Sequence, residues 1–194
     1  DCHNSNTARK NNLNASSTAL AECQRRALDM PGQPLEAFAR LVAAGGAIQV
    51  GDPEAALRHL GEVRSAFEDR RVIGSVDLGV STGLAMLQLG SIDAALEQLN
   101  AVERSDRAPT TYLDSSLALA LVAAGDLDLA VQHVSDVLSD DRATYLDRRT
   151  AMLVAALVEV RRGDVIAAEA RFKEAIDAID ATESRMSQAV VRLA

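Results

Sequence analysis

The sequence predicts an all-α protein in which antiparallel helix pairs stack into a superhelix. Three observations lead to this fold class. Alanine and leucine, both strong helix formers, are the most frequent residues of the 194-residue chain, and aromatic residues make up only 3%. The chain has no Asn-Gly or Asp-Gly hairpin signal. A turn built on glycine recurs four times at nearly regular spacing, which is typical of repeat architectures.

The repeated turn begins with a glycine and continues with a residue that can cap a helix. The glycines lie 39, 35 and 38 residues apart and are Gly51, Gly90, Gly125 and Gly163. The residues that follow them are Asp52, Ser91, Asp126 and Asp164. Glycine ends a helix readily because it adopts the left-handed conformation without a side-chain clash. Aspartate or serine can then accept a hydrogen bond from a free amide of the next helix.

Small and apolar residues recur at fixed distances from each glycine. Seven residues before it stand Ala44, Gly83, Ala118 and Ala156. Five residues after it stand Ala56, Ala95, Ala130 and Ala168. Nine residues after it stand Leu60, Leu99, Val134 and Phe172, and twelve after it stand Val63, Val102, Val137 and Ala175. The small residues allow two helices to approach closely. One such hairpin cannot bury its own apolar face, so we expect the hairpins to stack.

The expected helices follow from these turns and from the prolines between them. About ten are predicted, near residues 17–30, 35–50, 54–68, 73–89, 92–104, 110–124, 127–139, 142–162, 165–180 and 182–194. Pro31-Gly32-Gln33-Pro34 and Ala108-Pro109 separate neighbouring units. Residues 1–15 are polar and rich in asparagine, so we expect a flexible N-terminal segment. Residues 16–194 are expected to form one helical-repeat domain, with about four full repeats and half-repeats at its ends.

Composition and charge exclude several classes of protein. The 28 acidic and 20 basic residues give a net charge of −8, which disfavours direct nucleic-acid contact. No apolar run reaches the roughly 18 residues of a membrane span. Cys2 and Cys23 lack the short paired spacing of a metal site, and two cysteines in a chain of this size favour a cytoplasmic location. Because the chain starts without a methionine and ends within an apolar helical pattern, we expect it to be part of a longer or processed protein.

Few residues suggest catalysis. Gly79-Val80-Ser81-Thr82-Gly83 matches the serine-hydrolase pattern, but that pattern functions on a turn between a strand and a helix, and here it falls inside an expected helix. His59 and His133 each stand eight residues after a turn glycine and are expected to face solvent. The acidic stretch containing Asp136, Asp140, Asp141 and Asp147 is expected to be a solvated edge. We therefore expect no catalytic residue, metal or cofactor, and a protein that is not an enzyme. An enzyme built around Ser81 is the alternative.

Residues 35–180 resemble the tetratricopeptide repeat (TPR) family, which has a small residue in its first helix, Gly-Asp or a similar step at the turn, and alanines in its second helix. The resemblance implies a solenoid in which the first helices line a concave groove. The chain departs from the family at the position eleven residues before each glycine, where a bulky aromatic is common. That position holds Arg40, Gly79, Asp114 and Met152. The repeats are also longer than 34 residues.

A narrower likeness rests on a repeated tripeptide. Tyr112-Leu113-Asp114 recurs as Tyr145-Leu146-Asp147. This resembles the helical-repeat regions of large actinobacterial regulators, in which a helix-turn-helix or ATPase domain precedes the repeats. The likeness implies a ligand- or partner-sensing region of a larger transcriptional regulator.

The resemblance to TPR proteins also selects the residues that line the groove. They are Phe38, Leu41, Ile48, Gln49, Asp77, Val80, Leu84, Leu87, Gln88, Tyr112, Ser115, Leu119, Val122, Thr150, Leu153, Leu157, Val160 and Arg161. The set is largely apolar and lacks the Lys, Arg and Asn with which chaperone-binding members hold a carboxylate. It suits an amphipathic helix or a hydrophobic peptide, so we expect a non-catalytic protein-binding scaffold. Alternatively, the groove is closed by tight curvature, by a flanking segment, or by a second copy in a homodimer.

Overall fold

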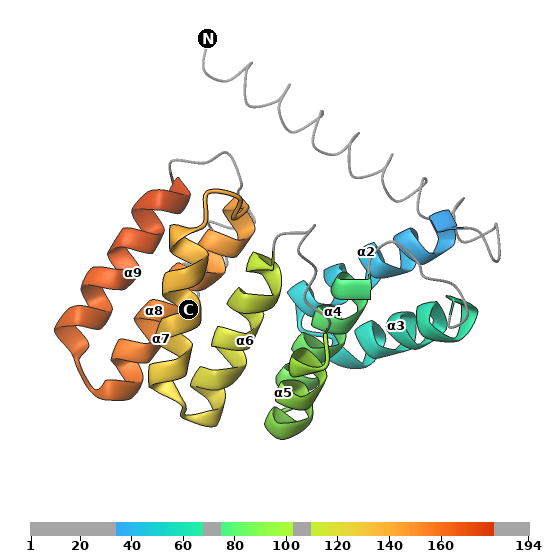
Figure 1. The fold of residues 1–194 in the computed structure, drawn as a ribbon, viewed down its shortest axis with the longest axis horizontal. Coiled ribbons are helices and arrows are strands. Elements are labelled where there is room, and N and C mark those ends of the chain that lie inside the picture. Colours follow the sequence, from blue (N-terminus) through green and yellow to red (C-terminus); the bar gives the residue numbers. More distant parts are fainter. Residues whose placement is uncertain (1–33, 68–74, 103–109, 181–194) are drawn as a thin grey trace, which may run out of the picture. The chain divides into compact units, whose positions relative to one another are not determined.

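The computed structural model describes residues 34–67, 75–102 and 110–180, and all regular structure in these ranges is helical (Figure 1). The helices are α2 (Pro34–Val50), α3 (Pro53–Phe67), α4 (Ser75–Gln88), α5 (Ile92–Asn100), α6 (Thr111–Ala124), α7 (Leu127–Ser139), α8 (Tyr145–Arg162) and α9 (Val165–Asp180). The all-α prediction is confirmed for these ranges. Eight helices stand there instead of about ten, because the segments predicted at 17–30 and 182–194 lie outside the described residues, as do Cys2, His3 and Cys23.

Two helix boundaries differ from the prediction by three residues or more. Helix α8 begins at Tyr145 and not near residue 142, because Thr144 is its N-cap. The Thr144 amide donates to Oδ2 of Asp147 at 3.0 Å, and the Asp147 amide donates back to Oγ1 of Thr144 at 3.3 Å. This reciprocal pair is a capping box. Helix α5 ends at Asn100 and not near residue 104, and the Val102 amide bonds the Leu99 carbonyl in a tighter final turn.

The four turn glycines share one backbone geometry. Their φ angles are 77° at Gly51 and Gly90, 90° at Gly125 and 79° at Gly163. The Gly125 amide donates to the Val122 carbonyl at 3.2 Å, and the following Asp126 amide donates to the Leu121 carbonyl at 2.9 Å. The same pair of bonds closes the other three turns, which makes each of them a Schellman motif. The prediction of left-handed glycine at all four turns is confirmed.

Three of the four predicted caps form. Oδ1 of Asp52 accepts from the Ala55 amide at 2.9 Å, and Oδ1 of Asp164 accepts from the Ala167 amide at 2.9 Å. Asp126 caps α7 in the same way through the Leu129 amide. Ser91 makes no side-chain cap, so the expectation fails there. Helix α5, which follows Ser91, has nine residues and starts on backbone hydrogen bonds alone.

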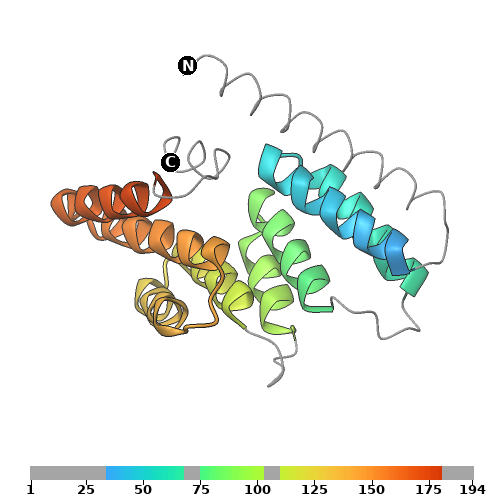
Figure 2. The same ribbon diagram turned by 90° about the horizontal axis from the view of Figure 1, so that it is seen from above.

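The chain divides between Ser81 and Thr82 into two compact units. In unit 1, helix α2 packs against α3 (Figure 2). Ala44 and Ala56, the small residues on either side of the Gly51 turn, are fully buried. Leu41 and Leu78 pack on a core of Ala37 and Val63. This is the close approach that the alanine pattern predicts.

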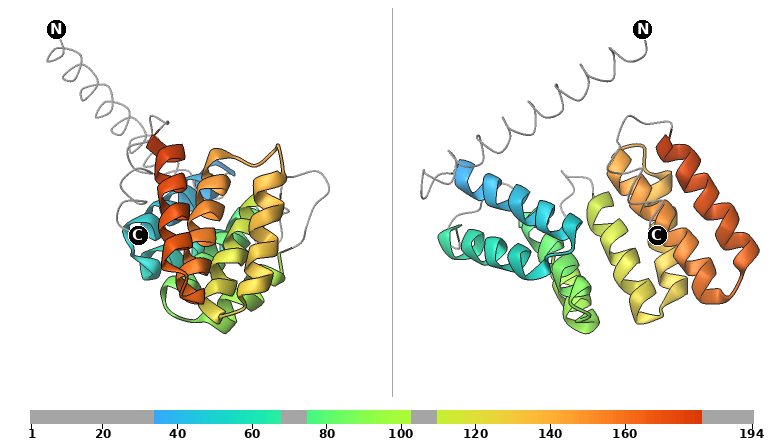
Figure 3. Two further views of the ribbon diagram at one scale, coloured as in Figure 1. Left: turned by 90° about the vertical axis from the view of Figure 1, so that its left-hand side faces the viewer. Right: turned by 180° about the vertical axis from the view of Figure 1, so that it is seen from behind.

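Unit 2 contains a chain of packed helix pairs. Helix α5 packs on α6, α6 packs on both α7 and α8, α7 packs on α8, and α8 packs on α9 (Figure 3). Its main core is made of Ala118, Leu121, Val122, Ala130, Val134, Val137, Ala151, Val154 and Val158. The small residues predicted around the turns of this unit are buried. Gly83 lies against Leu99, and a Cβ at Gly83 would stand 2.6 Å from Cγ of Leu99.

Candidate functional site

The predicted groove residues differ widely in exposure. Exposed are Phe38, Gln49, Asp77, Gln88, Val160 and Arg161. Half-buried are Leu41, Ile48, Leu84, Leu87, Tyr112, Leu119, Thr150, Leu153 and Leu157. Buried in helix packing are Val80, Ser115 and Val122. The last three present no accessible surface to a ligand, whereas the others keep at least part of their side chains open.

An apolar strip lies across two neighbouring helices of unit 2. Leu119 on α6 and Leu157 on α8 occupy the same position relative to their turn glycines, and both pack on the main core of the unit. Each keeps part of its surface open. Val160, one turn further along α8, is 50% exposed. We call these three residues the α6–α8 strip. Because α6 packs on α8, these three partly open apolar side chains belong to two helices in contact.

A polar cluster with two buried aspartates, which we did not predict from the sequence, lies in the same unit. Its members, here called the threonine–aspartate cluster, are Thr110, Thr111, Asp114, His133, Thr144 and Asp147. Asp147 is 4% exposed, and its Oδ2 accepts from Oγ1 of Thr111 and Oγ1 of Thr144, both at 2.8 Å. The first of these bonds joins the start of α6 to the start of α8. A buried carboxylate is tolerated only when it is hydrogen-bonded in this way.

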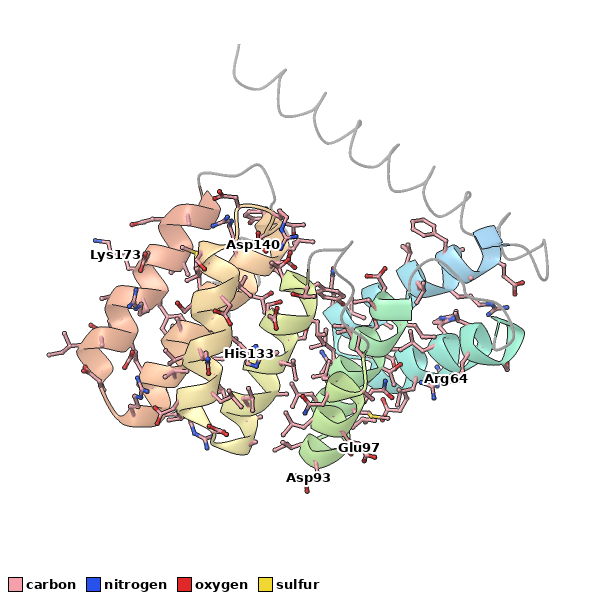
Figure 4. The ribbon with its side chains drawn as sticks, in the orientation of Figure 1. Arg64, Asp93, Glu97, His133, Asp140 and Lys173 are labelled. Carbon is pink, nitrogen blue, oxygen red and sulfur yellow. The ribbon has the colours of Figure 1, made fainter. Side chains whose placement is uncertain are left out.

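Asp114 forms the second half of the cluster. Its Oδ2 accepts from Oγ1 of Thr110 at 2.9 Å, and its Oδ1 lies 3.1 Å from Nδ1 of His133. Figure 4 labels His133 on α7, the helix that packs against α6. The expectation that His133 faces solvent is therefore wrong: its side chain is 17% exposed and contacts Asp114 across the hairpin. The contact between His133 and Asp114 therefore links α7 to α6.

The repeated Tyr-Leu-Asp segment has two different roles in this cluster. In the second copy, the preceding Thr144 caps α8. In the first copy, the N-cap position of α6 is one residue earlier, at Thr110, whose side chain makes no cap hydrogen bond. Thr111, the residue aligned with Thr144, lies inside α6 and donates to Asp147 of the other copy. The aligned threonines therefore differ: Thr144 caps its own helix, whereas Thr111 joins neighbouring hairpins.

His59 in unit 1 is also less exposed than expected. The ring is half-buried, and its Nδ1 is buried without a hydrogen-bond partner among the described residues. Burial lowers the pKa of His59, and the charges of Arg40 and Arg58 lower this pKa further. Arg40 itself is bound by two carboxylates, at 2.9 Å by Glu36 and also by Glu62 of α3. The neutral imidazole is therefore the form that this site favours.

A signal for these polar contacts exists in the sequence. Arg40 and Asp114 occupy the position eleven residues before the glycine, where the TPR family often has an aromatic. Each contacts a titratable residue on the second helix of its own hairpin, Glu62 and His133 respectively. An ionisable residue at that position, with an ionisable partner eight or eleven residues after the glycine, indicates a polar contact across the hairpin.

The acidic stretch after α7 is only partly a solvated edge. Asp136 and Asp141 are exposed, but Asp147 is buried in the threonine–aspartate cluster, so the expectation fails there. Hydrogen bonds from Arg142 hold the pKa of Asp140 below its usual value. The guanidinium of Arg148 donates to the carbonyls of Leu138 at 3.0 Å and Asp140 at 2.7 Å, which satisfies the end of α7.

The serine-hydrolase pattern lies within α4. Ser81 is 6% exposed and stands in the middle of a regular helix, so the strand-to-helix turn that the pattern requires is missing at residues 79–83. Among the described residues, no group of three or more His, Cys, Asp or Glu is placed to hold a metal ion. No helix in the described ranges combines the length and the apolar character needed to cross a membrane.

Comparison with known proteins gives no match. Neither protein-family models, nor curated proteins, nor solved structures match this chain. The assignment to a particular repeat family therefore stays a prediction from the sequence.

Proposed function

We propose that this chain is a non-catalytic binding scaffold of TPR-like hairpins, which takes an amphipathic helix or a hydrophobic peptide on its first helices. Four turns with one backbone geometry and one pattern of buried alanines support a regular array of hairpins. The observation that carries the proposal is the α6–α8 strip. Leu119 and Leu157 hold equivalent positions on packed helices, and Val160 extends the apolar surface toward the end of α8.

The chemistry of the strip selects the kind of partner. An amphipathic helix presents apolar residues three and four positions apart, and it can place them on side chains that stand on neighbouring helices. The net charge of −8 favours a partner whose polar face is basic. The same surface would serve the sensory region of a larger regulator.

The chain contains no tryptophan, which allows a direct binding test. The probe is a synthetic helical peptide of leucine and lysine with one tryptophan on its leucine face. Its emission should shift to the blue when the wild-type chain buries that face, without background from the protein. We expect Leu157→Glu combined with Val160→Glu to weaken binding about tenfold or more, because a carboxylate would be forced against apolar side chains.

The matched control is Ile166→Glu on α9. Ile166 is 82% exposed and apolar, but it belongs to a second helix and lies outside the proposed surface. Equal weakening by the control would show that the loss of binding is not specific to the α6–α8 strip and would overturn the proposal, because a response to overall charge alone would strengthen the binding of a lysine-rich peptide. So would unchanged binding by the Leu157/Val160 variant with its helical circular dichroism intact.

Dimerisation is a second candidate function, favoured by a different patch. Val165 and Ile166 at the start of α9 are 66% and 82% exposed, which is unusual for adjacent large apolar residues. If two copies meet at this patch, Ile166→Lys should convert a dimer into a monomer in light scattering coupled to gel filtration. A wild-type chain that is monomeric at high concentration would rule this candidate out.

A further inference from the structure

Arg161 places a positive charge at one end of the α6–α8 strip. It follows Val160 directly and stands four residues after Leu157, so it lies on the same side of α8 as Leu157. The residue is exposed, and its guanidinium reaches across to α6. Nη2 lies 3.8 Å from the position that a Cβ on Gly125 would occupy. Because Gly125 is the C-cap of α6, the guanidinium stands beside both helices of the strip.

The two arginines at the end of α8 differ in their partners. Nη2 of Arg162 lies 2.9 Å from Oδ1 of Asp128, and its Nη1 lies 3.8 Å from Oε1 of Glu159. Arg161 makes no ion pair and no hydrogen bond with any residue in the described ranges. A guanidinium has five N–H donors, and those of Arg161 are therefore available to a partner.

Four carboxylates lie in or next to the turns that follow α6 and α8. They are Asp126, Asp128, Glu159 and Asp164. Two of them bind Arg162, and the other two cap α7 and α9. Their negative charges would repel a partner that carries many acidic residues. The charges at this end of unit 2 therefore suit a partner whose polar face is mostly basic, with a single carboxylate at Arg161.

We propose that the amphipathic helix on the α6–α8 strip carries one aspartate or glutamate that pairs with Arg161. This inference rests on the proposed function, because it assigns a charge to the partner of the same surface. On a helix, an apolar residue and a carboxylate three or four positions apart lie on one side. Such a pair in the partner would meet Val160 and Arg161 together. The ion pair then fixes the direction in which the partner lies along the strip.

The test compares four peptides on three proteins. The first peptide is the leucine–lysine helix with one tryptophan. In each of the other three, one lysine beside the leucine face is replaced by glutamate, in the first, middle or last turn. Tryptophan emission gives the Kd of every peptide for the wild type, Arg161→Gln and Arg162→Gln. Arg162→Gln is the matched control, because it removes the same charge from the next residue.

We expect Arg161→Gln to weaken the binding of one glutamate peptide about threefold or more relative to the all-lysine peptide. The effect is modest because a charge pair at the edge of an interface is exposed to solvent. Arg162→Gln should change the same ratio by less than about 1.5-fold. Equal effects of the two variants, or an equal effect on all three glutamate peptides, would show that only overall charge matters and would overturn the proposal. An unchanged ratio would overturn it as well.

A structural role of Arg161 does not obscure this result. Its charge lies near the carbonyl end of α6, where a cation stabilises a helix, so Arg161→Gln can lower the stability of unit 2. The ratio between two peptides on the same variant is independent of that loss. If the wild type binds none of the peptides, the proposed function fails together with this inference. If it binds them without any dependence on Arg161, this inference alone fails.

Discussion

The α2–α3 hairpin of unit 1 and the α6–α7 hairpin of unit 2 have the same turn but opposite charges at one equivalent position. Gly51 and Gly125 both end a first helix in the left-handed conformation, and the aspartate after each caps the second helix. Eleven residues before the glycine, however, stands Arg40 in one hairpin and Asp114 in the other. The repeat therefore determines the position at which the two helices make a polar contact. It does not determine whether the residue at that position is basic or acidic.

The histidines show the consequence of this difference. Both lie eight residues after the glycine. Beside Arg40, His59 has a lowered pKa and a buried, unbonded Nδ1. Beside Asp114, His133 has a carboxylate 3.1 Å from its Nδ1. Histidine eight residues after the glycine is thus disfavoured as a cation in the α2–α3 hairpin, whereas in the α6–α7 hairpin it has an anionic partner. Variants that break these contacts can be ranked by how deeply each contact is buried.

The largest effect is expected from Asp114→Ala. This change leaves Thr110 and His133 without their shared acceptor at a position that is 7% exposed, and should destabilise unit 2 by about 2–3 kcal/mol. Arg40→Ala, the matched change in unit 1, removes a solvent-screened contact with Glu62, which is more than half exposed, and a contact with Glu36, whose side chain is 8% exposed. It should cost less than Asp114→Ala, about 1–2 kcal/mol.

Tyrosine fluorescence distinguishes a loss of stability in unit 2 from one in unit 1. Tyr112 and Tyr145 both belong to unit 2, so tyrosine fluorescence during urea unfolding reports that unit, whereas far-ultraviolet circular dichroism reports both. If Arg40→Ala lowers stability as much as Asp114→Ala, burial does not determine the strength of the contact and the comparison between the hairpins fails.

A somewhat smaller effect is expected at Gly83. In Gly83→Ala, the new methyl would stand 2.6 Å from Cγ and 2.8 Å from Cδ2 of Leu99, so α4 or Leu99 must shift. We expect a loss of about 1–2 kcal/mol in thermal or urea unfolding. Gly61→Ala on α3 is the opposite case, because its methyl meets open space in a helix and should stabilise by about 0.5–1 kcal/mol. A stabilising Gly83→Ala would mean that no close helix contact exists there.

Removing a helix cap is expected to lower stability by about 1 kcal/mol, and Ser91, which makes no cap, provides the control. Asp126→Ala and Asp52→Ala each remove a carboxylate that accepts from an amide of the following helix. Ser91 makes no such bond, so Ser91→Ala should change stability by only a few tenths of a kcal/mol. Equal losses at the three positions in urea unfolding would contradict the difference in capping.

These contrasts also show what the sequence could predict. The turns, three of the caps and the buried alanines depend on local backbone geometry and on side-chain size, which are visible in a single repeat. The threonine–aspartate cluster was missed because Thr111 and Asp147 are 36 residues apart and meet only where α6 packs on α8. Thr111 makes this bond from inside α6, one residue after the N-cap position at Thr110, and the pattern did not distinguish these two threonines. Three of the predicted groove residues, Val80, Ser115 and Val122, are buried in helix packing, which the pattern of a single repeat does not show.

The smallest effect is the pH dependence of stability that His59 causes. Because the pKa of His59 lies below its usual value in the folded chain, the unfolded chain binds the proton more readily. The contribution of His59 to stability is therefore present above the unfolded pKa and lost as the pH falls through the lower, folded pKa. Urea unfolding followed by circular dichroism between about pH 7.5 and about pH 5.5 should show this loss in the wild type. His59→Gln should reduce the pH dependence, whereas a steeper dependence would show that the imidazole is stabilised as a cation.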